Sequence, residues 1–359
     1  MDKNRYCVIM AGGIGSRFWP ISRRNMPKQF LDIAGTGKTF IQMTYERLAG
    51  IIPAGNFFVV TNVSYKALVL EQLPKLKESQ VLCEPIGRNT APCIAFAALH
   101  IAAIDPRAEM IVCPSDHLIL DQGEFIRSVE EAFDFVRSHD VLMTIGIKPS
   151  RPDTGFGYIQ IAGRERAGDI YRVKTFTEKP NLEMAKVFVD SGEFFWNAGI
   201  FLWKVKDIMV AMEQHMPDMW ELFQAVGADF GTPREQEAVN KVYSGCRSIS
   251  IDFGVMEKAD NVYVRISDFG WSDIGTWGSL YQYSEKDEGG NVASGDVMLY
   301  DTRNCIVKMP AGHLAVIEGL EDYIIVENRD VLMICKREHE QTIKTFIDEV
   351  QYKKGEKFI

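Results

Sequence analysis

The sequence lacks any long hydrophobic run. Its longest apolar stretches, such as Ile94–Leu99, are far shorter than the ~20 residues that a membrane-spanning helix needs. Near the start, the apolar run Tyr6–Ala11 is stopped at once by Gly12-Gly13, so it does not have the pattern of a signal peptide. The share of hydrophobic residues, 46%, and of charged residues, 25%, is that of an ordinary globular protein. We therefore expect no membrane partner.

Paired cysteines and clustered histidines are also missing. The seven cysteines are spread from Cys7 to Cys335 with no C-x-x-C pair, and the six histidines include no H-x-H pattern. This spacing argues against a zinc site and against a disulfide framework. It favours a reducing compartment, so we expect a cytoplasmic protein whose thiols are buried as small apolar groups.

Acidic residues are absent from one stretch of an otherwise acidic chain. The formal net charge is −9, which argues against a nucleic-acid partner. Between Lys3 and Leu31, however, there is no Asp or Glu. Such a run is often only a solvated basic face, but a glycine-rich loop lies inside this one and favours an anion site. The basic residues of the stretch are Lys3, Arg5, Arg17, Arg23, Arg24 and Lys28.

Short apolar runs alternate with amphipathic segments over the first part of the chain. This alternation predicts an α/β fold with a Rossmann-like mixed, mostly parallel sheet and helices on both faces. Ligands of such sheets bind at the carboxyl ends of strands. We expect Ser64 and Asn89 to cap two of the helices. The predicted strands are Tyr6–Met10, Phe57–Thr61, Val81–Glu84, Met110–Cys113 and Leu142–Ile147, and the predicted helices are Ile41–Ala49, Tyr65–Leu73, Thr90–Ala103 and Phe125–Arg137.

The later part of the chain is more mixed and ends in a β-rich region. A polar, glycine-rich stretch at Lys286–Asn291 indicates a hinge. We therefore expect a catalytic domain over residues 1–288 and a small β-rich, β-helix-like region over 289–359, which ends in a helix from about Glu338 to Gln351. Further predicted elements are strands at Gly155–Ile159, Tyr171–Thr177, Ala198–Trp203 and Val262–Ile266, a helix at Leu182–Ser191, and late β-type runs at Val297–Tyr300, Cys305–Lys308, Leu314–Ile317, Tyr323–Val326 and Val331–Cys335.

The first predicted strand leads into a loop with three glycines in four positions, Gly12, Gly13 and Gly15. Glycines let the backbone approach a ligand closely and turn successive N–H groups toward it. The loop does not match the dinucleotide fingerprint, because Phe18 stands where G-x-G-x-x-G needs its last glycine. Arg17 and Lys28 follow it, and a guanidinium fork with a mobile ammonium suits a triphosphate.

A second glycine-rich stretch, Gly35–Thr39, imitates a phosphate-binding P-loop. That motif needs a glycine five positions before Gly37, where this sequence has Asp32. We therefore expect a surface turn here, and a P-loop kinase is excluded.

Two aspartates are the candidate ligands of a magnesium ion. Asp116 follows the predicted strand Met110–Cys113, and Asp273 lies far along the chain in a glycine-rich segment. Magnesium takes hard oxygen ligands, usually one or two carboxylates with substrate phosphates and water. The simpler alternative for each aspartate is a turn or helix cap, and Asp273 could cap a helix that starts near Thr276. Spacing alone does not show that the two side chains meet.

Taken together, these segments resemble the sugar-nucleotidyltransferase family, and most closely its bacterial mannose-1-phosphate guanylyltransferases (GDP-mannose pyrophosphorylases). The resemblance extends over roughly residues 5–285 and is weaker beyond. The matching motifs, in order, are AGGIGSRFWPISR at 11–23, PKQF at 27–30, EPIGRNTAP at 84–92, PSDHLI at 114–119, GFGYIQ at 155–160, FTEKP at 176–180, WNAGIF at 196–201, SIDFGVMEK at 250–258 and FGWSDIGTW at 269–277.

The resemblance implies a transfer of GMP from GTP to mannose 1-phosphate with release of pyrophosphate. It implies nucleotide contacts from the loop Ala11, Gly12, Gly13 and Gly15 with Arg17 and Lys28, base contacts from Glu84 and Asn89, magnesium at Asp116 and Asp273, sugar contacts from Gly157, Glu178 and Asn197, and a sugar-phosphate contact from Lys179. Simpler roles stay open for three of them: Asn89 as a helix cap, Glu178 as the partner of Lys179, and Asn197 as a turn residue.

Two other functions remain open on the sequence. One is a pyrophosphorylase for another base or sugar, and the other is a catalytically silent sugar-nucleotide-binding regulator. The presence of Arg17, Lys28, Asp116 and Asp273 speaks against the regulator. Longer family members carry an additional isomerase domain, and we expect no isomerase activity here. The resemblance also implies a homodimer formed through the C-terminal β-rich region.

Overall fold

The computed structural model describes residues 2–359, the side chains of residues 164–167 excepted. The chain divides into two compact units, each assembled from segments that are distant in sequence. The sheet unit contains the chain up to Gly12, Thr44–Ser115 and Ile119–Trp271, and the tail unit contains Gly13–Met43, Asp116–Leu118 and Ser272–Ile359. The compact units therefore do not follow a single boundary near residue 288, because the segment after the first glycines folds with the C-terminal residues.

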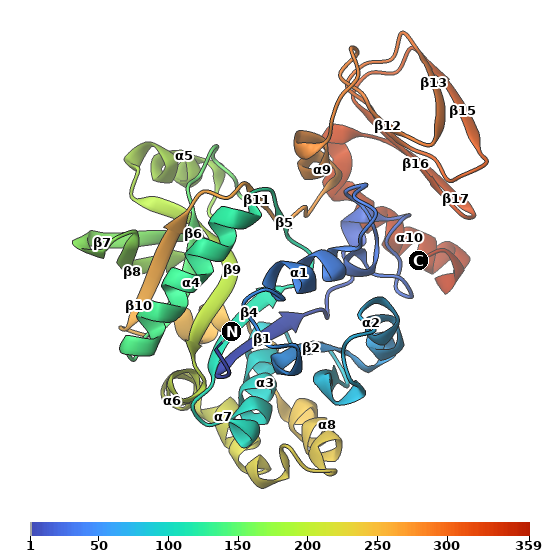
Figure 1. Cartoon of the computed structure of the whole chain (residues 1–359). Coiled ribbons are helices and arrows are strands. Elements are labelled where there is room, and N and C mark those ends of the chain that lie inside the picture. Colours follow the sequence, from blue (N-terminus) through green and yellow to red (C-terminus); the bar gives the residue numbers. More distant parts are fainter. Residues whose placement is uncertain (1) are drawn as a thin grey trace. The chain divides into compact units, whose positions relative to one another are not determined.

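The sheet unit is built on a nine-stranded sheet in the order β3-β2-β1-β4-β9-β6-β10-β8-β7 (Figure 1). β1 pairs in parallel with β2 and β4, and β6 with β10, whereas β9 is antiparallel to both β4 and β6. The predicted mixed α/β sheet is thus confirmed. The strands are β1 (Arg5–Met10), β2 (Phe57–Asn62), β3 (Val81–Glu84), β4 (Glu109–Pro114), β6 (Leu142–Ile147), β7 (Tyr158–Ala167), β8 (Ile170–Thr177), β9 (Phe194–Lys204) and β10 (Val262–Ser267).

Burial on both faces explains why the first strands were recognisable. β1, β2, β4 and β6 are almost wholly buried, so they read as continuous apolar runs rather than as alternating patterns. β7 begins later than predicted, at Tyr158. The Asp153 carboxylate accepts the Gly155 N–H (2.8 Å) and holds the preceding segment in a turn.

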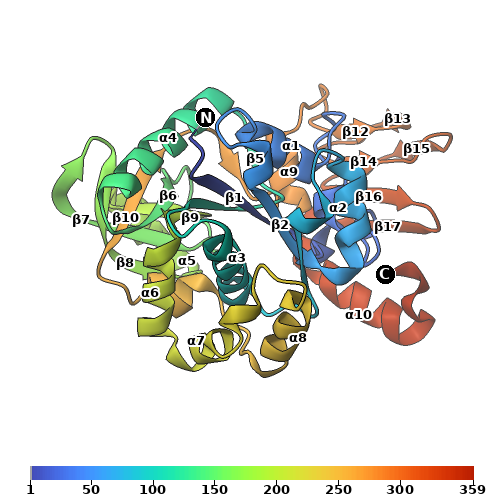
Figure 2. The same cartoon turned by 60° about the horizontal axis from the view of Figure 1, so that its bottom comes forward.

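Helices cover both faces of the sheet, as predicted. Figure 2 shows α4 on one face and α3, α6 and α7 on the other. Asn89 caps α3 as expected, accepting the N–H of Thr90. The predicted cap at Ser64 is wrong, because Asn62 accepts the Ser64 N–H (2.9 Å) and starts a 3₁₀ turn before α2. The helices are α1 (Phe40–Leu48), which spans both units, α2 (Lys66–Gln72), α3 (Thr90–Ile104), α4 (Gln122–Ser138), α5 (Leu182–Ser191), α6 (Val205–His215), α7 (Pro217–Gln224) and α8 (Glu235–Gly245).

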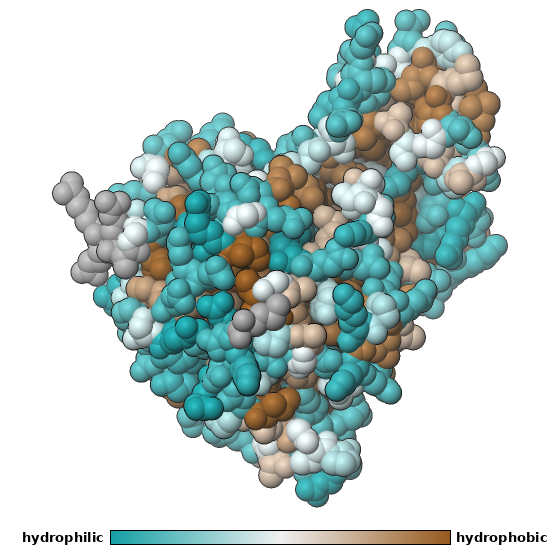
Figure 3. Space-filling view, in the orientation of Figure 1, coloured by the Kyte–Doolittle hydropathy of each residue, from teal (hydrophilic) through white to brown (hydrophobic). Residues whose placement is uncertain are grey.

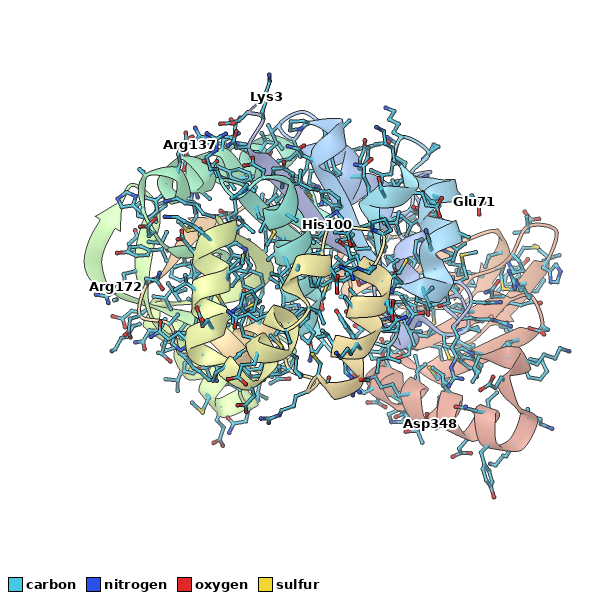
Figure 4. The ribbon with its side chains drawn as sticks, turned by 90° about the horizontal axis from the view of Figure 1, so that it is seen from below. Lys3, Glu71, His100, Arg137, Arg172 and Asp348 are labelled. Atoms are coloured by element: carbon cyan, nitrogen blue, oxygen red, sulfur yellow. The ribbon has the colours of Figure 1, made fainter. Side chains whose placement is uncertain are left out.

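A large hydrophobic core lies between the sheet and the helices α3, α6, α7 and α8. α3 is buried along most of its length, which its alanine-rich sequence permits. One polar contact joins two of these helices. His100 lies on α3 and is labelled in Figure 4. Its Nδ1 atom lies 2.6 Å from the Glu235 carboxylate at the start of α8. This contact fixes the beginning of the helix that carries Tyr243, described below.

The tail unit combines the segment after the first glycines with the C-terminal β-rich region. β12, β14, β16 and β17 form one sheet and β13 with β15 another. The core of the first of these sheets includes Phe18, Trp19 and Phe40, so early and late residues share one hydrophobic cluster. The Trp19 indole N–H also donates to the carbonyl of Phe358 (2.7 Å). The remaining elements are β12 (Val292–Ser294), β13 (Asp296–Tyr300), β14 (Ile306–Lys308), β15 (Leu314–Glu318), β16 (Tyr323–Asn328), β17 (Val331–Lys336), α9 (Trp277–Tyr283) and α10 (Ile343–Lys354), with β5 (Leu118–Ile119) and β11 (Trp271–Ser272) at the unit boundaries.

The last helix begins later than the sequence predicts. Residues Arg337–Thr342 form a 3₁₀ segment, and α10 starts only at Ile343. Two side chains of this segment make contacts within the tail unit: Glu340 accepts the N–H of Gly278 (2.7 Å) and Gln341 accepts from Arg17 (3.0 Å). These contacts account for the departure from a continuous helix.

Apolar side chains gather on the outer face of β13 and β15. Burial alternates along both strands, and the outward residues Met298, Tyr300, Leu314 and Val316 are 45–63% exposed. Figure 3 shows this patch as brown atoms at the upper right. Within residues 2–359, no helix combines the length and the apolar character needed to cross a membrane.

Candidate active site

The glycine loop of the tail unit is held against the segment that carries Lys28. Gly15 adopts a left-handed conformation (φ 67°), and a Cβ atom there would lie 2.3 Å from the Cβ of Lys28. The Gln29 side chain donates to the carbonyl of Gly13 (2.8 Å), and the Lys28 N–H donates to that of Ile14 (3.3 Å). Only glycine fits at position 15, because a side chain there would meet both backbone strain and steric overlap.

Lys28 brings the two predicted carboxylate residues together. Its ammonium donates to Asp116 Oδ2 (2.9 Å) and to the backbone carbonyl of Asp273 (2.6 Å). The side chain is almost fully buried, although it carries a charge. The rings of Phe18 and Phe40 lie 5.8 and 5.2 Å from the ammonium, which adds a cation–π attraction. A buried lysine with this environment is fixed in one position.

The Asp116 carboxylate is a charged group that is one third exposed. Burial acts to raise its pKa, but the charges of Lys28 and His117 and the hydrogen bonds to the carboxylate outweigh burial, so the pKa is lower than usual. Asp273 accepts the N–H of Gly275 through Oδ1 (3.0 Å), as a turn aspartate does. The cap of α9 is Thr276, not Asp273.

These two residues are a suitable donor set for magnesium. Asp116 offers a solvent-accessible carboxylate oxygen next to the Lys28 ammonium, and that ammonium contacts Asp273 through its backbone carbonyl. Both residues carry the hard carboxylate oxygens that magnesium prefers. Among the residues that the structure describes, no group of three or more Asp, Glu, His or Cys side chains is arranged to hold a metal. An ion at this position would therefore take at most two protein carboxylates and complete its shell with water and phosphate, as magnesium commonly does.

Arg17 lies two residues beyond the last glycine, on a 3₁₀ turn over Ser16–Phe18. Its Nε atom donates to the Gln341 side chain (3.0 Å), and the following residues Phe18 and Trp19 are buried in the tail-unit core. The guanidinium is thus oriented by a residue near the C-terminus, through one of its five N–H groups.

The sheet unit contains the residues expected to bind the base. Glu84 ends β3 and is 5% exposed; its Oε1 atom accepts from the hydroxyl of Tyr243 (2.8 Å). A Cβ atom on Gly12 would lie 3.3 Å from Glu84 Oε2, so this carboxylate faces the beginning of the glycine loop. Burial raises the pKa of Glu84 to about 7, and the hydrogen bond from Tyr243 acts in the opposite direction. Ala11 is buried, and its carbonyl accepts from Thr61 (2.8 Å).

Asn89 has the simpler role that the sequence left open. Its side chain accepts the N–H of Thr90 (2.8 Å), and its backbone is left-handed (φ 67°). Asn89 is therefore the N-cap of α3, as predicted, and its contact with a base stays a prediction.

The four residues expected at the sugar lie close together in the sheet unit. A Cβ atom on Gly157 would be 2.7 Å from Glu178 Oε2 and 3.7 Å from the Cβ of Asn197. Glu178 forms an ion pair with Lys179 (2.7 Å). Asn197 lies within β9 and does not form a turn before it, and its backbone N–H donates to the carbonyl of Gly157 (2.8 Å). This cluster offers carboxylate, amide and ammonium groups.

Four residues of this arrangement were not found from the sequence. Thr144, whose hydroxyl lies 3.2 Å from Asn197 Oδ1, is one of them. Like Tyr243 and Gln341, it stands in a segment without a distinctive motif, so no local pattern points to these three. Asp252, by contrast, lies inside the SIDFGVMEK motif at 250–258, and its position there was a usable signal. Its side chain accepts from Asn197 (2.7 Å).

Comparison with known proteins identifies the class of enzyme. Residues 6–290 match the nucleotidyl transferase family, and residues 295–350 match a MannoseP isomerase/GMP-like beta-helix domain. The chain belongs to the nucleotidyl transferase family and is a nucleotidyltransferase, which confirms the resemblance seen in its motifs.

Several named relatives narrow the comparison further. The chain is 37% identical over 352 residues to a mannose-1-phosphate guanylyltransferase of Klebsiella pneumoniae, covering 95% of this chain and 73% of that protein. It is 36% identical over 358 residues to the enzyme of that name from Escherichia coli K12, covering 96% and 73%. A crystal structure from Thermus thermophilus, named a mannose-1-phosphate geranyltransferase, superposes with a TM-score of 0.87 at 28% identity, covering 97% and 99%.

Proposed function

We propose that the protein transfers GMP from GTP to mannose 1-phosphate, forming GDP-mannose and pyrophosphate. The family acts on a nucleoside triphosphate and a sugar 1-phosphate, and the relatives named above supply the particular pair. The observation that carries the proposal is the Lys28 ammonium, which is buried and fixed between the Asp116 carboxylate and the Asp273 carbonyl.

The residues present suit an in-line displacement at phosphorus. A phosphate oxygen of the sugar 1-phosphate forms a bond to the α-phosphorus, the bond from that phosphorus to the bridging oxygen of the β-phosphate breaks, and pyrophosphate leaves with the electron pair. The attacking oxygen is already anionic, so no Ser, Cys or His nucleophile and no strong base is required. Positioning and charge neutralisation are required instead, and Lys28 and Arg17 supply positive charge for both.

Asp116 and Asp273 would hold a magnesium ion, which when bound neutralises charge on the triphosphate. In this proposal the backbone of Gly13 and Gly15 allows close approach to the phosphates. Gly157, Glu178 and Asn197 contact the sugar hydroxyls, and Lys179 contacts the sugar phosphate.

Glu84 supports the choice of guanine. Its ionised carboxylate accepts hydrogen bonds only, and guanine presents two adjacent donors, N1–H and N2–H₂, on one edge. Tyr243 occupies Oε1 and fixes the direction of the carboxylate. Uracil and thymine present one donor at N3, flanked by two carbonyl acceptors that a carboxylate repels.

The test is one assay of nucleotides against sugar 1-phosphates, read by release of pyrophosphate. We expect GTP with mannose 1-phosphate to give the highest kcat/KM, at least about tenfold above dTTP or UTP, which corresponds to one lost hydrogen bond to a charged group. Preference for another pair would make the protein a pyrophosphorylase for that pair. Tight binding of sugar nucleotides without pyrophosphate release would indicate a silent regulator and contradict the proposal.

We infer further that two copies of the chain associate through the β-rich C-terminal region. The support is the outward apolar face of β13 and β15, formed by Met298, Tyr300, Leu314 and Val316. Exposed apolar patches of this kind mark interaction surfaces. Replacing Val316 with Glu should convert a dimer into a monomer in analytical ultracentrifugation, and a wild-type monomer at micromolar concentration would contradict the inference.

A further inference from the structure

The side-chain amide of Asn197 is held from both sides. Its Oδ1 atom accepts from the Gly199 N–H (3.1 Å), and its Nδ2 atom donates to Asp252 Oδ1 (2.7 Å). The Thr144 hydroxyl also lies 3.2 Å from Oδ1, and its single proton is shared with the carbonyl of Ile200 (3.2 Å). A backbone N–H can only donate, and an ionised carboxylate can only accept. The two ends of the amide are therefore not interchangeable, and the orientation of Asn197 follows from its neighbours.

Asp252 is itself placed by the backbone around it. The residues before it are held by the segment 88–91: the N–H of Ile249 donates to the Arg88 carbonyl (3.3 Å), and the N–H of Ile251 donates to the Thr90 hydroxyl (2.8 Å). Asp252 then begins a single π-helical turn, Asp252–Met256. Such turns are rare and are often found at functional sites. The carboxylate thus has a defined position from which to orient Asn197.

The hydrogen bond from Asn197 favours the ionised form of Asp252. Burial raises the pKa of the Asp252 carboxyl and the nearby Glu178 charge adds to this, whereas the hydrogen bond from Asn197 lowers it. The negative charge of Glu178 raises the pKa of both Asp252 and Glu257, and the nearby cations Lys179 and Lys258 act in the opposite direction. A hydrogen bond between a buried carboxylate and an amide in this setting is among the stronger ones.

One N–H of Asn197 remains available to a ligand. The amide has two N–H groups, and Asp252 takes one of them; in the part of the chain that the structure describes, the other has no partner. Glu178, across the Gly157 backbone, offers an acceptor within the same small cluster. A donor beside an acceptor matches a sugar hydroxyl, which both accepts and donates.

We propose that Asp252 is a positioning residue that holds the Asn197 amide with one N–H directed at a hydroxyl of the sugar 1-phosphate, so that Asp252 sets sugar affinity without touching the substrate. This inference rests on the proposed function, because it assigns the sugar to this cluster. It predicts that Asp252 acts only through Asn197.

A double-mutant cycle tests this dependence. Asp252→Ala should raise the KM for mannose 1-phosphate about tenfold, the loss expected for one hydrogen bond to a charged partner, with the KM for GTP changed less than about twofold. In an Asn197→Ala background the same substitution should change the KM for the sugar phosphate by less than about twofold, since the amide it positions is gone. Additive effects in the cycle would overturn the proposal.

Three further variants separate positioning from general damage. Asp252→Asn keeps an acceptor oxygen for Asn197 and should restore a KM near that of the wild type. Thr144→Val removes a donor on the other side of the amide and should raise the same KM, and it keeps the proposal testable if Asp252→Ala fails to fold. Glu257→Gln removes a neighbouring negative charge that does not contact Asn197 and should leave the sugar KM within about twofold.

Failure of the proposed function is distinguishable from failure of this inference. If no triphosphate and sugar-phosphate pair yields pyrophosphate, the proposed function is wrong, and binding of mannose 1-phosphate by the same proteins is then measured by calorimetry. A loss of affinity in Asp252→Ala that vanishes in the Asn197→Ala background supports the positioning role. Equal losses in both backgrounds, or a parallel loss of GTP binding, contradict it.

Discussion

The ammonium of Lys28 lies 2.9 Å from the carboxylate of Asp116, and the two residues are separated by 87 intervening positions in the chain. The same ammonium donates to the carbonyl of Asp273 as well. A single buried cation therefore organises both aspartates that the sequence suggested for magnesium. The position of Lys28 therefore bears on both charge neutralisation and metal binding.

Lys28→Ala should lower kcat by about 10²–10³, the usual loss when a preorganised charge at a reacting phosphate is removed. The KM for mannose 1-phosphate should change far less, because the proposed contact of Lys28 is with the triphosphate. Steady-state kinetics with both substrates varied will separate the two constants. A rise in the sugar KM at constant kcat would contradict the role of Lys28.

Asp116→Asn and Asp273→Asn should each abolish most magnesium-dependent turnover while the protein stays folded. Each substitution removes a charged oxygen ligand but keeps the size of the side chain. Turnover is measured over a magnesium titration, with circular dichroism as the control for folding. Unchanged magnesium dependence in both variants would remove the metal from the proposal.

Gly15→Ala should cut turnover about 100-fold, because a Cβ atom 2.3 Å from the Cβ of Lys28 must displace that residue. Gly35→Ala is the matched control. Gly35 is also left-handed (φ 71°), but nothing lies within 4 Å of its Cβ position. Both variants should lose about 1 kcal/mol of unfolding free energy from backbone strain, and only Gly15→Ala should lose activity.

Guanine binding should weaken as the pH falls below about 7, the pKa of Glu84. The base binds the ionised carboxylate, so protonation competes with binding, and the affinity should fall up to about tenfold for each pH unit below the pKa. The measurement is the Kd of guanosine from pH 5.5 to 8.5, because guanosine carries no phosphate that titrates in this range.

Two variants check the origin of that pH dependence. Tyr243→Phe removes the hydrogen bond that lowers the pKa of Glu84, so the midpoint should move to higher pH. Glu84→Gln removes the titrating group and should give weaker binding with no dependence on pH over this range. A flat profile in the wild type would show that Glu84 does not contact the base.

Arg47→Met should raise the unfolding free energy by about 1–2 kcal/mol. Arg47 is 7% exposed, and two of its guanidinium nitrogens have no hydrogen-bond partner in the described part of the chain. Burial lowers its pKa to about 10, which means that folding disfavours its charged form. Denaturation with urea measures the change, and a loss of stability would indicate that the contact of the guanidinium with the Phe125 ring (5.5 Å) outweighs the cost of its burial.

The sequence was informative where structure is local. Fully buried strands such as β1 and β4 produce uninterrupted apolar runs, and the Asn89 cap follows from a side chain bonding to the next residue. The tail unit was not predictable in this way, because it depends on contacts such as that of Trp19 with Phe358, which lie 339 positions apart. The local pattern of apolar and polar residues does not indicate which distant segments share a hydrophobic core.

The same distinction holds within the site. Asp116 and Asp273 were recognised from motifs, but only the structure shows that the Lys28 ammonium contacts both of them. Tyr243 and Thr144 are invisible to a motif search because each acts on a residue from another element. The side chains that orient a site are fixed by tertiary packing, which a linear pattern does not encode.

The shared core of Phe18 and Trp19 with the late β-strands has a practical consequence for anyone who edits this enzyme. Exchanging the β-rich region for that of a relative would also replace the residues that support the segment Arg17–Trp19. Trp19 donates a hydrogen bond to Phe358, and Arg17 donates one to Gln341. Chimeras joined near residue 288 should be assembled together with residues 13–43 from the same parent. Otherwise the glycine loop and Arg17 would pack against residues from another protein, and these hydrogen bonds would be lost.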